Sequence, residues 1–108
     1  MIRGTCQQFR FKIPYAKSQL SQARITFWQK EDNSDEDSVL ITKTLDDCAE
    51  PFVSGELYVT LDQIETLHFT VDRKAYVQFR ALTTDGFAFG SRPQQITVYP
   101  TKDETVLG

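Results

Sequence analysis

The chain has 108 residues and a formal net charge of -3, with 40% hydrophobic and 25% charged residues. This length accommodates one domain with its own core, and the composition excludes an intrinsically disordered chain. Twelve Lys and Arg against fifteen Asp and Glu argue against a nucleic-acid partner, and one His and two Cys argue against a metal site rich in imidazole or thiolate.

Short segments with a period of two dominate the chain, as in strands with one buried face. We predict strands at residues 8–13, 23–29, 38–43, 56–61, 75–82, 87–91 and 94–99. Their inward phase is expected to hold Phe9, Phe11, Ile13, Ala23, Ile25, Phe27, Val39, Ile41, Leu57, Val59, Leu61, Ala75, Val77, Phe79, Ala81, Phe87, Phe89, Ile96 and Val98.

Two connections carry local signals. Thr60-Leu61-Asp62-Gln63 has the spacing of a capping box and predicts a short helical turn near 61–67. Asp85-Gly86 predicts a tight hairpin. About seven short strands with regular turn signals predict an all-β fold, a single antiparallel β-sandwich of the immunoglobulin-like type over residues 1–100, followed by a loose tail at 101–108.

No apolar run at the start indicates a signal peptide, and none elsewhere is long enough for a transmembrane helix. We therefore expect synthesis in the cytoplasm and no membrane partner. Cys6 and Cys48 are then expected to be reduced and to serve as small buried or half-buried hydrophobes. A bridge between them is the open alternative.

The acidic run 31–37 carries five carboxylates. An EF-hand loop needs Gly at its sixth position and Glu at its twelfth, but counting from Asp32 these positions are Asp37 and Lys43. We expect a solvated hairpin tip, with a cation site as the alternative. His68 is the only His, and the sequence contains no nucleophile elbow or phosphate-binding loop, so we predict no enzyme activity, no cofactor and no metal.

Three aromatic side chains fall on the outward phase of their strands: Trp28, Tyr58 and Tyr76. Arg24 and Arg80 share that phase. Exposed aromatics beside arginines are typical of protein interfaces, so these five residues are the candidate interface. The same aromatics could instead form a sugar-stacking platform, lie covered by loops, or include a tyrosine corner.

Several segments occur in an order that resembles short proteins encoded among the structural genes of phages and prophages of Gram-positive bacteria. These are Arg3-Gly4-Thr5, Phe11-Lys12-Ile13-Pro14, Arg24-Ile25-Thr26-Phe27, the run from Leu57 to Phe69, the run from Val77 to Gly86, and Ser91. The acidic run 31–37 and the segment 50–55 depart from that pattern. The resemblance implies a tail or baseplate context and carries over no catalytic residue.

The expected function is therefore that of a non-enzymatic phage or prophage virion protein, structural or accessory, made in the host bacterial cytoplasm. Its expected partners are other virion proteins or further copies of itself. The alternative is a small carbohydrate-binding module that uses Trp28 and Tyr58. A host-directed inhibitor that mimics nucleic acid through its acidic run is disfavoured by the modest net charge.

Overall fold

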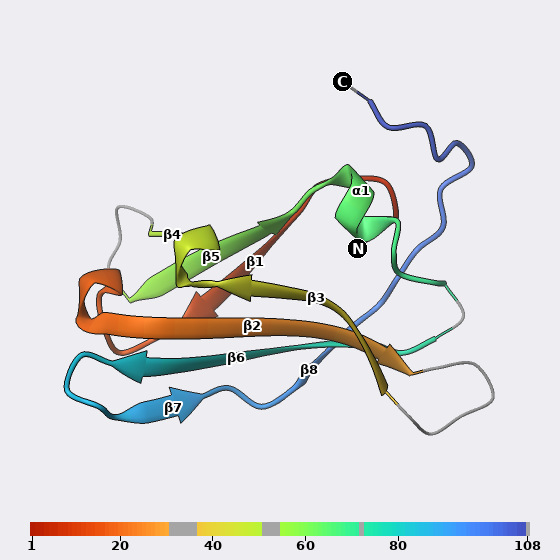
Figure 1. Ribbon diagram of the computed structural model, residues 1–108. Helices are drawn as coiled ribbons and strands as arrows, with labels where there is room; N and C mark the ends of the chain where they lie inside the picture. Colours follow the sequence, from red (N-terminus) through yellow and green to blue (C-terminus); the bar gives the residue numbers. More distant parts are fainter. Residues whose placement is uncertain (31–36, 51–54, 72, 108) are drawn as a thin grey trace.

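Two antiparallel sheets pack face to face in the computed structural model, which describes residues 1–30, 37–50, 55–71 and 73–107 (Figure 1). The smaller sheet has the order β1 (Gln7–Lys12), β5 (Glu56–Leu61) and β4 (Cys48–Ala49). The larger sheet has the order β3 (Asp37–Thr44), β2 (Leu20–Lys30), β6 (Ala75–Thr83) and β7 (Ala88–Gly90), and β8 (Gln94–Ile96) also pairs with β6. The predicted all-β antiparallel sandwich is confirmed, with eight strands among the described residues.

In the described part of the chain, three short helices lie between the strands: η1 (Lys17–Gln19), η2 (Leu45–Asp47) and α1 (Gln63–Thr66). The helical turn predicted near 61–67 is confirmed, but its capping box begins two residues later than predicted. The Asp62 carboxylate accepts a hydrogen bond from the Glu65 amide at 2.8 Å, and the Glu65 carboxylate accepts one from the Asp62 amide at 3.0 Å. Thr60 cannot serve as the cap because it is still part of β5, opposite Gln8.

The core between the sheets consists mainly of the predicted inward residues. Phe27 and Phe69 are fully buried, and their ring centroids lie 6.5 Å apart with the rings edge to face. The Phe9 ring contacts Phe27 at 5.1 Å in the same way. Alternation along β2, β5 and β6 therefore supplies the two buried faces, as the sequence predicts.

Two predicted inward residues are exposed: Val39 at 61% and Phe87 at 60%. Val39 is displaced by a bulge in β3, because Phe27 pairs with Ile41 whereas Trp28 pairs with Val39, which leaves Leu40 as the extra residue. Phe87 has the predicted phase but lies in the β6–β7 hairpin, which extends beyond the ends of β1 and β5 (Figure 1). Among the described residues, none of the strands of the smaller sheet extends over this hairpin.

The two ends of the chain meet at the same end of the sandwich. Ile2 forms a parallel bridge with Tyr99, and the Tyr99 amide donates to the Met1 carbonyl at 2.7 Å. Further along the C-terminal segment, the Gln63 side chain accepts a hydrogen bond from the Leu107 amide at 2.7 Å.

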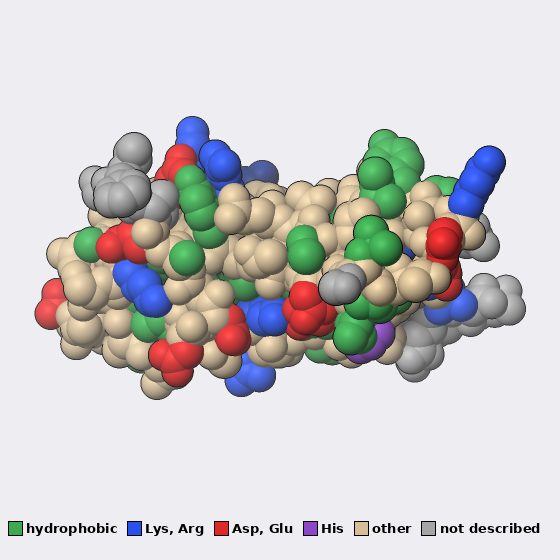
Figure 2. Space-filling model, turned by 90° about the horizontal axis from the view of Figure 1, so that it is seen from above, with side chains coloured by type: hydrophobic (Ala, Val, Ile, Leu, Met, Phe, Trp, Pro, Cys, Tyr) green, Lys and Arg blue, Asp and Glu red, His purple; other side chains and the backbone are tan. Residues whose placement is uncertain are grey.

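Seen from above, the molecule is elongated (Figure 2). On the face that this view shows, charges of both signs are scattered and hydrophobic side chains gather near the histidine. The boundary predicted at residue 100 stays a prediction.

Candidate interaction face

Four of the five predicted interface residues lie on one surface. Trp28 on β2 is the cross-strand partner of Tyr76 on β6, and Arg24 on β2 is the partner of Arg80 on β6. Their neighbours Ile25, Phe27, Val77 and Phe79 point into the core, so these four side chains project from the opposite side of the larger sheet. We call this surface the Trp28 face.

A stacked aromatic pair lies at one end of the Trp28 face. The rings of Trp28 and Tyr76 stack with centroids 5.6 Å apart and planes 23° apart, and both side chains are half-buried. Such a pair stabilises a sheet by about 0.5–1.5 kcal/mol beyond the area that it buries. The pair therefore presents a rigid apolar surface whose conformational entropy is already low.

The two arginines have no such stabilising contact. Arg24 and Arg80 face each other across the strands, and neither guanidinium forms a hydrogen bond or an ion pair with a described residue. Like charges directly opposite each other destabilise a sheet. Beside them lies an open hollow of about 230 Å³, lined also by Leu82 and Ala88. A carboxylate from a partner would relieve the repulsion between the two guanidinium groups.

The bulge in β3 adds a residue that the sequence did not point to. Val39 stands next to Trp28, and Gln95 of β8 stands on the other side of Tyr76. The row Val39, Trp28, Tyr76 and Gln95 thus crosses four strands with apolar side chains at its β3 end. Only the cross-strand register reveals Val39 here, because its phase in the sequence places it inward.

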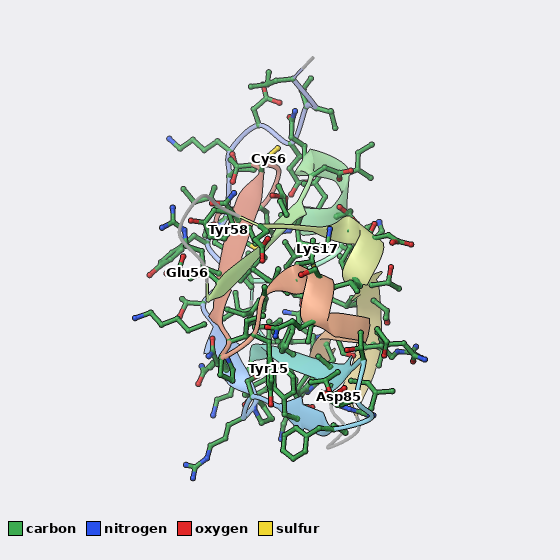
Figure 3. All side chains as sticks on the ribbon, turned by 90° about the vertical axis from the view of Figure 1, so that its left-hand side faces the viewer. Cys6, Tyr15, Lys17, Glu56, Tyr58 and Asp85 are labelled. Carbon is green, nitrogen blue, oxygen red and sulfur yellow. The ribbon has the colours of Figure 1, made fainter. Side chains whose placement is uncertain are left out.

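Tyr58 belongs to a different surface. It lies on β5 of the smaller sheet, where the Arg10 guanidinium sits 4.7 Å above the centroid of its ring. Figure 3 shows Tyr58 beside β1 and β5, far from Asp85 on the hairpin of the larger sheet. The outer faces of the two sheets point in opposite directions, so Tyr58 cannot act together with Trp28.

Among the described residues, the tyrosines on the two outer faces form no tyrosine corner. Neither Tyr58 nor Tyr76 donates a hydrogen bond through its hydroxyl to any described residue, so neither forms a tyrosine corner. Both side chains are half-buried, which leaves part of each ring accessible to a partner.

Residues that could bind a metal ion are not clustered in the described ranges. No group of three or more His, Cys, Asp or Glu residues in them has metal-binding geometry, and His68 is exposed. The acidic run 31–37 falls outside the described residues, apart from the backbone of Asp37. None of the described helices is long and apolar enough to cross a membrane.

The two cysteines are both free thiols, and their environments differ. Cys48 is buried as predicted, and its Sγ lies 3.4 Å from the Thr44 carbonyl oxygen. Cys6 is exposed, contrary to the prediction, because it precedes β1 on the outward phase of Gln8 and Arg10. Burial raises the pKa of the Cys48 thiol, and the charge of Lys17 only partly offsets this.

We expect iodoacetamide to modify Cys6 quickly at pH 8 and Cys48 only after unfolding, as followed by peptide mass spectrometry. At a pH between the ordinary thiol pKa and the raised pKa of the folded protein, the Cys48 thiol loses its proton in the unfolded chain but keeps it in the folded one. The stability that the neutral thiol provides is therefore complete below that pKa and falls as the pH rises toward the raised folded value. Equal rates of iodoacetamide modification at Cys6 and Cys48 in the folded protein would contradict the difference in burial between the two thiols.

Comparisons with known proteins bear on the fold. No family model and no curated protein matches the chain. Among solved structures, murine CRIg superposes with a TM-score of 0.50 at 9% sequence identity, over 94% of this chain and 90% of that one. The fold is immunoglobulin-like. At this identity, the likeness concerns the fold alone.

The strand order of this immunoglobulin-like sandwich matches strands B, E and D for β1, β5 and β4. Strands C′, C and F correspond to β3, β2 and β6, and strand G corresponds to β7 and β8 together. Antibody domains link strands B and F with a disulfide. Here the same two strands are joined by stacked rings, Phe11 on β1 and Phe79 on β6, with centroids 5.2 Å apart.

Proposed function

We propose that this protein is a non-enzymatic interaction protein that binds another protein through the Trp28 face. The observation that carries the proposal is the joint placement of the Trp28–Tyr76 stack and the Arg24–Arg80 pair on one sheet. Trp, Tyr and Arg are the residues most enriched at the centres of protein interfaces. Two opposed arginines without a partner among the described residues cost stability in the free protein, and a bound carboxylate would remove that cost.

The proposed context is a phage or prophage virion, in which the protein is a structural or accessory component of the tail or baseplate. The resemblance of its strand and turn segments to such proteins supports this context. The protein would be made in the host bacterial cytoplasm and would assemble there with other virion proteins or with further copies of itself.

The geometry favours a protein partner over a carbohydrate. A sugar platform built from Trp28 and Tyr58 is not formed, because the two rings lie on different sheets. Trp28 and Tyr76 also stack on each other, so each ring has one face occupied. A flat stack of two aromatic rings beside two arginines is better suited to contact the side chains of another protein than to bind a sugar ring.

Co-expression with the products of neighbouring genes, followed by size-exclusion chromatography with light scattering, tests this function. We expect either a complex of fixed stoichiometry with one of those products or a defined homo-oligomer. A strict monomer that binds none of the neighbouring products would contradict the proposal.

A further inference from the structure

A second surface, remote from the Trp28 face, is the free edge of β1. Within the described ranges β1 pairs with β5 on one side and with no strand on the other. The residues before β1 do not cover this edge with a strand, because Ile2 bridges to Tyr99 instead. In terms of the immunoglobulin-like fold, none of the described strands takes the position beside strand B that strand A occupies in immunoglobulin domains.

The register shows which backbone groups point to this edge. The Ile13 amide donates to the Gly55 carbonyl at 2.8 Å, which continues the β1–β5 ladder. In an antiparallel ladder, hydrogen-bonded pairs alternate, so the amides and carbonyls of Gln8, Arg10 and Lys12 point away from β5. The Gln8 carbonyl accepts from its neighbour's side chain, the Gln7 amide group, at 3.2 Å. The groups of Arg10 and Lys12 have no such partner among the described residues.

A groove of about 510 Å³ runs beside this edge, between β1 and the β7–β8 segment. Phe11, Phe79 and Phe89 supply aromatic surface to it. Tyr15, near the β6–β7 hairpin in Figure 3, packs against the Phe89 ring at 5.2 Å. The groove therefore opens onto the aromatic part of the core.

The wall of the groove opposite β1 is formed by the segment between β7 and β8. Its sequence explains why this segment does not pair continuously with β6. The Ser91 hydroxyl accepts a hydrogen bond from the Phe79 amide at 3.1 Å, and the Ser91 amide donates to the Phe79 carbonyl at 2.8 Å. Pro93 then follows and has no amide proton to donate to a ladder. The ladder with β6 is thus interrupted where the groove is lined by Gly90, Ser91 and Gln94.

The charges around the groove are of one sign. Arg10 and Lys12 line it, and no carboxylate does. Neither cation forms an ion pair with a described residue, although Glu56 is the cross-strand partner of Lys12. Although the Arg10 guanidinium also lies over the Tyr58 ring, an occupant with carboxylates on its outward phase would therefore lie next to two cations that have no carboxylate partner among the described residues.

We propose that the β1 edge accepts an extended segment of a partner protein as an added strand, with apolar and acidic residues in alternation. Its backbone would pair with Arg10 and Lys12, its apolar side chains would enter the groove beside Phe11 and Phe89, and its carboxylates would lie beside the two cations. Backbone pairing supplies the affinity in this mode of recognition, and the pockets for alternate side chains supply the specificity.

The test uses a fluorescein-labelled, end-capped nine-residue peptide that alternates valine and glutamate. We expect saturable binding in fluorescence anisotropy, and no binding of the matched peptide that alternates valine and lysine. In ¹⁵N NMR spectra the amides of Gln8, Arg10 and Lys12 are expected to shift, whereas those of Thr26 and Gln78 on the Trp28 face are not. Failure to saturate at millimolar peptide, or equal binding of the lysine peptide, would overturn the proposal.

Two substitutions at position 10 distinguish the contribution of the backbone amide to peptide binding from that of the cationic side chain. Arg10→Ala removes the cation but keeps the amide proton at the edge. Arg10→Pro removes both without breaking the ladder to β5, so it should bind at least about tenfold more weakly than Arg10→Ala. Lys102→Ala, which removes an exposed cation outside both surfaces, should leave peptide binding unchanged. Equal affinities for the alanine and proline variants, or a dimer of the protein alone that Arg10→Pro abolishes, would refute the proposal and leave the Trp28 face unaffected.

Discussion

Replacing Phe27 with alanine is expected to lower the free energy of unfolding by about 3–5 kcal/mol. Phe27 is fully buried, and its ring contacts those of Phe9 and Phe69. Truncation leaves a cavity between two sheets that are each held by ladders on either side, so the site cannot collapse to fill it. Such a loss is a large part of the stability of an ordinary domain, which is about 5–15 kcal/mol.

Urea unfolding followed by the fluorescence of Trp28 measures this loss. Phe87→Ala is the matched control, because the same atoms are removed from a side chain that is 60% exposed. We expect it to change the free energy of unfolding by less than about 0.5 kcal/mol. If Phe27→Ala does not fold, Phe27→Leu should still be measurably less stable than the wild-type protein. Equal losses for Phe27→Ala and Phe87→Ala would contradict the assigned core.

Trp28→Ala is expected to weaken the complex with the protein partner at least about 30-fold, the effect of an interface residue worth about 2 kcal/mol. The indole is the largest side chain of the Trp28 face, and its stack with Tyr76 holds it in place. The affinity is measured by calorimetry on the complex obtained by co-expression.

Arg80→Ala separates a binding role from a structural one. It should also weaken the complex, yet it should not destabilise the free protein, because it removes the repulsion from Arg24. Tyr58→Ala, on the smaller sheet, should leave the affinity unchanged. If Tyr58→Ala weakened the complex while Trp28→Ala did not, the Trp28 face would not be the interface.

Much of this fold could be predicted because alternation reports directly on burial. The strand predicted at 56–61 coincides with β5, with Leu57, Val59 and Leu61 buried and Tyr58 outside. Asp85-Gly86 forms the predicted turn, with Gly86 at a φ of 87°. These features depend on neighbouring residues in the chain, so the sequence contains all the information that they require.

The composition of the site could be predicted only in part. Alternation assigns a residue to a face but does not say which strands pair, so it could not separate Tyr58 from Trp28 and Tyr76. The bulge at Leu40, which brings Val39 beside Trp28, depends on register with β2 and leaves no mark in the local pattern. The exposure of Phe87 depends on how far the opposite sheet extends, which is a property of the assembled sandwich.

Site-specific photo-crosslinking tests the role of the Trp28 face most directly. A benzoylphenylalanine is placed at Gln78, between the Trp28–Tyr76 and Arg24–Arg80 pairs, or at Thr60 on the outer phase of β5 as the control. Both forms are irradiated with the co-expressed partner. We expect a crosslink from position 78 that Trp28→Ala abolishes, and none from position 60. A crosslink from position 60 alone would contradict the proposed interface.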